Sequence, residues 1–124
     1  MSGIEYLIDT NILIYIVQGN PSVEYFADEE KLAISYITEM EALGKYGISP
    51  LEKQIIGSFL SRCHIIEMNT RIKLLAIDLK QQTRLKLPDA VVAATAIEYS
   101  LLLVTADKEF ERISNLNLLL MNIS

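Results

Sequence analysis

The chain has 124 residues, of which 51% are hydrophobic and 22% are charged, and its net charge is −5. This length is enough to bury one core, and the composition excludes a disordered chain. Polar residues interrupt every apolar stretch before it reaches the roughly 18 residues of a membrane span, and the N-terminal residues lack the basic and apolar regions of a signal peptide. The single cysteine, Cys63, offers no disulfide framework, so we expect a reducing cytoplasm.

Short apolar runs alternate with helical patterns along the whole chain. The apolar runs predict β-strands at residues 4–8, 32–36, 63–68, 101–105 and 118–121. Polar caps and proline positions predict helices at residues 10–18, 22–30 (capped by Ser22), 38 to 44–47 (capped by Thr38), 50–62, 70–84, 88–99 and 108–113. Because strands alternate with helices, the pattern predicts one α/β domain over residues 1–124, with a parallel sheet and right-handed crossovers.

Four carboxylates lie where apolar runs end. Asp9 ends the first run, Glu41 lies just past the second, and Asp107 comes two residues after the fourth. Asp89 follows Leu87-Pro88 and opens an alanine-rich helical stretch. The carboxyl ends of parallel strands form the ligand crevice of an open sheet, so neighbouring strands would bring these acids together. Like charges in one crevice repel each other unless a cation lies among them, which predicts a divalent-metal site.

The predicted ligands suit Mg²⁺ or Mn²⁺, which bind carboxylate oxygens together with water and substrate phosphate. Such an ion stabilises charge on a phosphoryl oxygen and lowers the pKa of bound water, which gives a nucleophile near neutral pH. Neighbouring hydroxyl and amide groups are candidates for orienting the carboxylates, namely Thr10, Asn11, Thr38 and Thr105.

Each of the four acids also has a purely structural explanation. Asp9 can cap the first helix, and Glu41 can complete a capping box with Thr38. Asp89 can favour a helix N-terminus through its charge, and Asp107 can cap the helix that begins at residue 108. One shared site explains the joint pattern more economically than four independent caps.

Other titratable residues are weaker candidates. Glu39 lies two residues from the second acid and would face another direction in a helix, whereas Glu109 or Glu111 can replace the fourth acid as a ligand. His64 lies inside a strand, where a core or edge imidazole is expected rather than a general base. Cys63 has no second cysteine to pair with, so a buried, inert thiol is expected.

A local cluster of basic residues weakens the objection that an acidic chain does not bind nucleic acid. One segment holds a single acid, Asp78, and five basic residues, namely Arg71, Lys73, Lys80, Arg84 and Lys86. Such a strip can engage phosphates on an acidic protein, although a solvated helix face explains each residue taken alone. The few glycines form neither a phosphate loop nor a dinucleotide fingerprint, which disfavours a nucleotide-binding module.

Four stretches carry the acids in order: YLIDTNILI (6–14), SYITEME (35–41), LPDAVVAATA (87–96) and LVTADKEF (103–110). Together they resemble the motifs of PIN-domain ribonucleases, and in particular the VapC-like toxins of prokaryotic toxin–antitoxin pairs. The resemblance spans almost the whole chain, in the order of the family's motifs.

The resemblance implies an acidic quartet that binds metal and carries catalysis, formed by Asp9, Glu41, Asp89 and Asp107. It implies supporting roles for Asn11, Thr38 and Thr105. It also implies a parallel sheet with α-helices on both faces, Mg²⁺- or Mn²⁺-dependent cleavage of RNA, a homodimer, and a cognate antitoxin protein that blocks the site. Members of the family vary at the last acidic position, so Glu109 is the alternative to Asp107.

These observations favour a cytoplasmic, metal-dependent endoribonuclease over two other functions. A receiver-like phosphoacceptor domain needs paired acids after the first strand and a lysine after the last, and neither is present. A catalytically silent PIN-fold scaffold that acts through a protein or RNA partner is the alternative. The presence of all four acids favours the enzyme.

Overall fold

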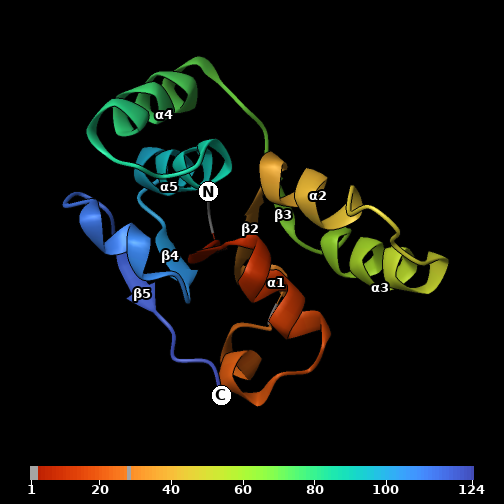
Figure 1. The fold of residues 1–124 in the computed structure, drawn as a ribbon. Coiled ribbons are helices and arrows are strands. Elements are labelled where there is room, and N and C mark those ends of the chain that lie inside the picture. The colour runs from red at the N-terminus through yellow and green to blue at the C-terminus, as the bar shows by residue number, and fades with distance from the viewer. Residues whose placement is uncertain (1–2, 28) are drawn as a thin grey trace.

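The computed structural model describes residues 3–27 and 29–124, and in this part of the chain five strands form one sheet (Figure 1). All paired strands are parallel, and their order is β3-β2-β1-β4-β5. The strands are β1 (Tyr6–Ile8), β2 (Leu32–Ser35), β3 (His64–Ile66), β4 (Leu102–Thr105) and β5 (Leu118–Leu120). The predicted parallel α/β fold is therefore confirmed.

Helices connect the strands. The α-helices are α1 (Thr10–Val17), α2 (Tyr36–Leu43), α3 (Pro50–Leu60), α4 (Thr70–Gln82) and α5 (Leu87–Glu98). Short 3₁₀ helices are η1 (Pro21–Phe26), η2 (Glu29–Lys31) and η3 (Lys108–Arg112). In the described part of the chain, no helix combines the length and the apolar character needed to cross a membrane.

The two faces of the sheet build two separate hydrophobic clusters. Successive residues of a strand point to opposite faces, so Leu7 and Ile8 of β1 belong to different clusters. Leu7 packs in the cluster that contains the buried faces of α4 and α5, whereas Ile8 packs in the cluster that contains those of α1 and α3. Figure 1 shows α4 with α5 on one side of the sheet and α1 with α3 on the other, as expected for helices on both faces.

Two predicted helix starts are wrong. Ser35, not Thr38, caps α2, because its hydroxyl accepts a hydrogen bond from the Ile37 amide at 3.2 Å. Helix α2 therefore begins directly after β2, and Thr38 lies inside its first turn. The helix predicted at 22–30 is instead the pair η1 and η2, and Asn20 rather than Ser22 caps η1. Residue 28 of that predicted helix lies outside the described residues.

An aromatic side chain packs the segment after β4 against the hydrophobic core. Phe110 of η3 is fully buried and packs in the cluster that contains α4 and α5. Phe110 and the buried Ile113 that follows η3 therefore anchor the segment that carries Asp107 and Glu109.

We expect Phe110→Ala to lower the free energy of unfolding by about 3–5 kcal/mol, through lost burial and the cavity left behind. Urea denaturation measures this difference. Tyr46→Ala is the control, because the Tyr46 side chain is fully exposed and its removal should change stability by less than about 0.5 kcal/mol. Equal effects of the two substitutions would contradict the anchoring role.

Candidate active site

Asp9 lies directly after β1 and caps α1. Its Oδ1 accepts a hydrogen bond from the Ile12 amide at 3.0 Å, and its Oδ2 accepts one from the Thr105 hydroxyl. Thr105 is the last residue of β4, and the pairing of Ile8 with Val104 brings the two strand ends together. Asp9 is only 6% exposed, so one carboxylate serves as a helix cap and as a buried anion at the sheet edge.

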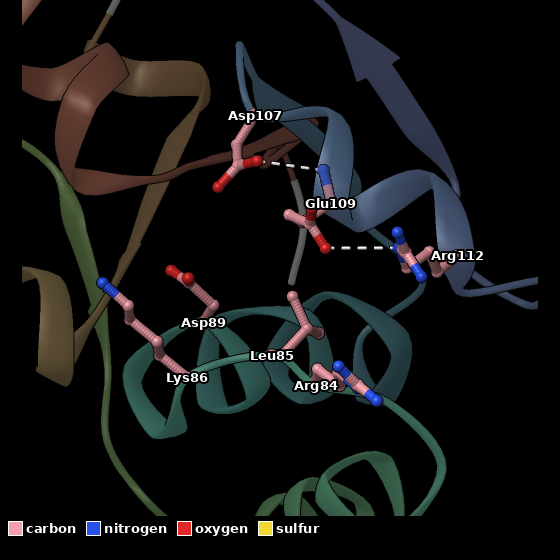
Figure 2. A pocket seen from close by; sticks show the side chains of 7 residues that line it. All are labelled: Arg84, Leu85, Lys86, Asp89, Asp107, Glu109 and Arg112. Atoms are coloured by element: carbon pink, nitrogen blue, oxygen red, sulfur yellow. Dashed lines mark hydrogen bonds and ion pairs between the residues drawn. The ribbon is translucent and has the colours of Figure 1, made fainter.

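The same threonine also orders the acid that follows β4. The Thr105 hydroxyl accepts a hydrogen bond from the Asp107 amide at 3.1 Å. Asp107 in turn caps η3, since its Oδ1 accepts from the Glu109 amide at 2.9 Å (Figure 2). One buried hydroxyl therefore connects Asp9 to the segment that presents Asp107.

The other two acids come from helices rather than from strand ends. Glu41 lies in the second turn of α2, where the Thr10 hydroxyl of α1 donates a hydrogen bond to its Oε1 at 2.7 Å. Asp89 lies in the first turn of α5, where Pro88 occupies an early helical position. Of the four predicted acids, two are placed by the sheet and two by the helices packed beside it.

All four predicted acids border one hollow of about 290 Å³. Its lining consists of Asp9, Thr10, Asn11, Glu41, Lys86, Asp89, Val92 and Asp107. Asn11 thus lines the hollow, as the sequence predicts. Thr105 does not line the hollow but donates a hydrogen bond to Asp9, which does. Thr38 and Glu109 do not line it, and the Glu109 carboxylate instead pairs with Arg112 at 3.2 Å.

Burial and mutual repulsion raise the pKa of two of these carboxyl groups. Burial is the largest cause of the raised pKa of Asp9, and it outweighs the lowering by the hydrogen bonds from Thr105 and Ile12. The charges of Asp107 and Glu41 raise the pKa of Asp9 further. The hollow therefore resists the full ionisation of its own acids.

The pKa of Asp89, which is less buried than Asp9, is raised by the same two causes. Burial raises its pKa first, and the charges of Asp107, Asp9 and Glu41 add to the effect. The Lys86 ammonium partly offsets them, since it lowers the pKa of Asp89. All four acids are thus electrostatically coupled, and a positive charge in their midst would relieve the repulsion.

The donor set fits a hydrated divalent ion rather than a closed metal cage. In residues 3–27 and 29–124, no three His, Cys, Asp or Glu side chains form a cluster that holds an ion directly. Mg²⁺ keeps several waters and uses one or two carboxylates, so oxygen ligands spaced around a hollow suit it. The buried Thr38 hydroxyl, which has no hydrogen-bond partner among the described residues, lies three residues from Glu41 on one face of α2.

The basic segment from residue 71 to 86 does not act as one strip. Arg71 pairs with Glu98 at 2.7 Å, and the Lys80 ammonium donates to the Leu85 carbonyl at 2.7 Å. Lys73 and Lys80 border an apolar groove next to Met68, Ile77 and Leu87. Of the five basic residues, Arg84 and Lys86 lie beside the acids, together with Arg112, for which the sequence carried no signal.

The fold and the site define an α/β protein with an acidic hollow at the carboxyl edge of a parallel sheet. Comparison with known proteins identifies its family. The PIN domain model matches residues 6–116. The chain therefore belongs to the PIN domain family. It is 32% identical over 127 residues to Ribonuclease VapC2 of Rickettsia felis, an alignment that covers 90% of this chain and 93% of that protein. Ribonuclease VapC1 of Haemophilus influenzae strain R2866 is 31% identical over 125 residues, with the same coverage.

Solved structures show the same similarity in three dimensions. A toxin–antitoxin complex from Klebsiella pneumoniae matches with a TM-score of 0.77 and 32% identity, over 93% of this chain and 96% of that chain. VapBC2 from Rickettsia felis, bound to a DNA fragment from its promoter, matches with a TM-score of 0.81 and 26% identity, over 96% and 100% of the chains. The resemblance to VapC-like proteins read from the sequence motifs is confirmed.

We expect Asp89→Asn to stabilise the metal-free protein at neutral pH, because it removes a carboxylate whose ionisation the fold disfavours. The folded state binds a proton at Asp89 more tightly than the unfolded chain, so wild-type stability gains as pH falls through the raised pKa. The stability difference between the variant and wild type should therefore shrink on acidification and vanish below the ordinary pKa of 3.8. Urea denaturation in EDTA across this pH range measures it.

Asp78→Asn is the matched control. Asp78 is exposed on α4 and accepts a hydrogen bond from the Gln82 amide at 3.2 Å, away from the hollow. It should change stability by less than about 0.5 kcal/mol. A destabilised Asp89→Asn protein at neutral pH would show that the carboxylates do not repel each other as described.

Proposed function

We propose that this protein is a Mg²⁺- or Mn²⁺-dependent endoribonuclease that hydrolyses RNA phosphodiester bonds, and that it is the toxin of a toxin–antitoxin pair in the cytoplasm. The observation that carries the proposal is the convergence of Asp9, Glu41, Asp89 and Asp107 on one hollow, where burial and the neighbouring negative charges raise the pKa of Asp9 and Asp89. The similarity to proteins named Ribonuclease VapC supports RNA as the substrate.

The four carboxylates would hold the hydrated ion together, in part through its bound waters. When bound, Mg²⁺ or Mn²⁺ supplies positive charge to a phosphoryl oxygen and lowers the pKa of a water molecule. Thr105 holds Asp9 and Thr10 holds Glu41, so the carboxylate oxygens are oriented before substrate arrives. In the reaction the water oxygen bonds to phosphorus as one P–O ester bond breaks.

The proposed partners follow from the same comparisons. The Klebsiella pneumoniae structure is a toxin–antitoxin complex, which supports a cognate antitoxin protein for this chain. A homodimer is the proposed assembly, on the basis of the motif resemblance. Light scattering of the purified protein, alone and with the antitoxin, would measure both stoichiometries.

We expect Asp9→Asn and Asp89→Asn each to lower RNA cleavage by more than about 100-fold, because loss of an acid exceeds the 10–100-fold typical of outer-shell changes. The assay uses a panel of structured RNAs with Mn²⁺, with Mg²⁺ or with EDTA, and EDTA should abolish cleavage. Asp78→Asn, purified identically, should cleave like wild type.

The outcomes of this assay separate the proposed enzyme from its alternatives. Cleavage that survives in both folded variants would identify a contaminant or a different site. No cleavage of any RNA, together with no metal binding by calorimetry, would favour the non-catalytic scaffold.

We expect Thr105→Val to lower metal affinity and activity by about 10–100-fold without removing any acid. The substitution leaves Asp9 Oδ2 without its donor and the Asp107 amide without its acceptor. Thr95→Val is the matched control, because Thr95 is equally buried but its hydroxyl donates to the Val91 carbonyl within α5. Equal metal affinities of the two variants in calorimetry would contradict the role of Thr105.

A further inference from the structure

A second, larger hollow adjoins the acidic one. It measures about 630 Å³, against about 290 Å³ for the acidic hollow, and the two share Lys86, Asp89 and Asp107. Figure 2 shows Asp89 and Asp107 on one side of this hollow and Arg84 and Arg112 on the other. The carboxylates of the proposed metal site are thus continuous with a surface that carries cations.

The cationic surface extends beyond the second hollow. Arg84 and Arg112 also border a third hollow of about 410 Å³, whose other lining residues are Gln81, Gln82 and Thr83. The three hollows therefore form one groove, with carboxylates at one end, guanidinium groups in the middle and amides at the far end. A groove that tracks a nucleic-acid backbone with positive charge is the usual way in which proteins hold a single strand.

The loop that presents Arg84 and Lys86 is held by its own hydrogen bonds. The Thr83 hydroxyl donates to the Leu79 carbonyl at 2.8 Å and accepts from the Leu85 amide at 3.3 Å. Leu85 is buried, and its carbonyl accepts from the Lys80 ammonium at 2.7 Å. Arg84 and Lys86 flank this fixed residue and are both exposed, so binding a ligand there requires little ordering of the backbone.

Arg112 already has an anionic partner in the free protein. Its Nε lies 3.2 Å from Oε2 of Glu109, and the two side chains are 66% and 55% exposed. An ion pair so exposed to water is weak. A phosphate, which guanidinium groups bind in a bidentate manner, can therefore replace the Glu109 carboxylate.

We propose that this basic hollow receives the RNA phosphates next to the cleaved bond, with Arg84 and Arg112 as their ligands, and that Glu109 competes with RNA for Arg112. The inference rests on the proposed ribonuclease function. The carboxylates repel phosphates and the guanidinium groups attract them, so the groove orients the strand with only the scissile phosphate at the metal site. Glu109 is then a brake on substrate binding rather than a metal ligand.

The test is fluorescence anisotropy with a short, fluorescein-labelled single-stranded RNA in EDTA, with salt varied from about 50 to 200 mM. Arg84→Gln and Arg112→Gln should each weaken binding about five-fold at 0.1 M salt and lower the slope of log K against log salt by about 0.7. Glu109→Gln should tighten binding, because it removes a negative charge and frees Arg112. A side chain with only a structural role would not give this gain.

Arg71→Gln is the matched control, since Arg71 is also exposed and paired with a glutamate but lies outside the groove. It should bind RNA like wild type. Four outcomes would each overturn the proposal. Two concern the arginines: unchanged binding by both Arg84→Gln and Arg112→Gln, or equal weakening by Arg71→Gln. The other two are weakened binding by Glu109→Gln and no RNA binding by wild type at the lowest salt.

Cleavage kinetics with Mn²⁺ separate this inference from the proposed function. If the function is correct, Arg84→Gln should raise KM several-fold and leave kcat and the metal affinity near their wild-type values. Cleavage with an unchanged KM in both arginine variants would contradict the proposed RNA-binding role of the groove and remain consistent with the proposed ribonuclease function. Arginine-dependent RNA binding without any cleavage would contradict the proposed ribonuclease function and support the RNA-binding role of the groove.

Discussion

Four carboxylates repel one another around the hollow at the carboxyl edge of the sheet. Burial and like charges raise the pKa of Asp9 and Asp89, so the metal-free fold holds these groups at a cost in free energy. The packing of two hydrophobic clusters on the sheet offsets this cost. Neither cluster contains any of the polar residues that line the acidic hollow. This repulsion is the physical reason to infer a cation, because a cation among the carboxylates attracts each of them and offsets their mutual repulsion.

The acids are held by hydrogen bonds that also build the local structure. Asp9 and Asp107 are helix caps, so the same oxygens that satisfy amide groups at helix starts also border the hollow. The capping and functional explanations of these residues are therefore not alternatives. Thr105 links the two caps, and this link is possible because β1 and β4 are neighbouring strands of the sheet.

The two ends of the groove carry opposite charges. Carboxylates gather where the scissile phosphate would meet the metal, and arginines gather where the adjoining phosphates would lie. The net charge of −5 for the whole chain does not reveal this local separation of negative and positive side chains. Local charge, rather than the sum over the chain, decides which part of the surface attracts RNA.

Periodicity, caps and motif order are local properties, and they were enough to predict the strands, most helices, the parallel α/β class and the four acids. Tertiary structure decided what local patterns do not contain. Ser35 rather than Thr38 caps α2, because β2 runs directly into the helix. Asp9 and Asp107 border one hollow because β1 and β4 are neighbours in the sheet. Arg84 and Arg112 border one hollow because packing brings the segment between α4 and α5 next to η3.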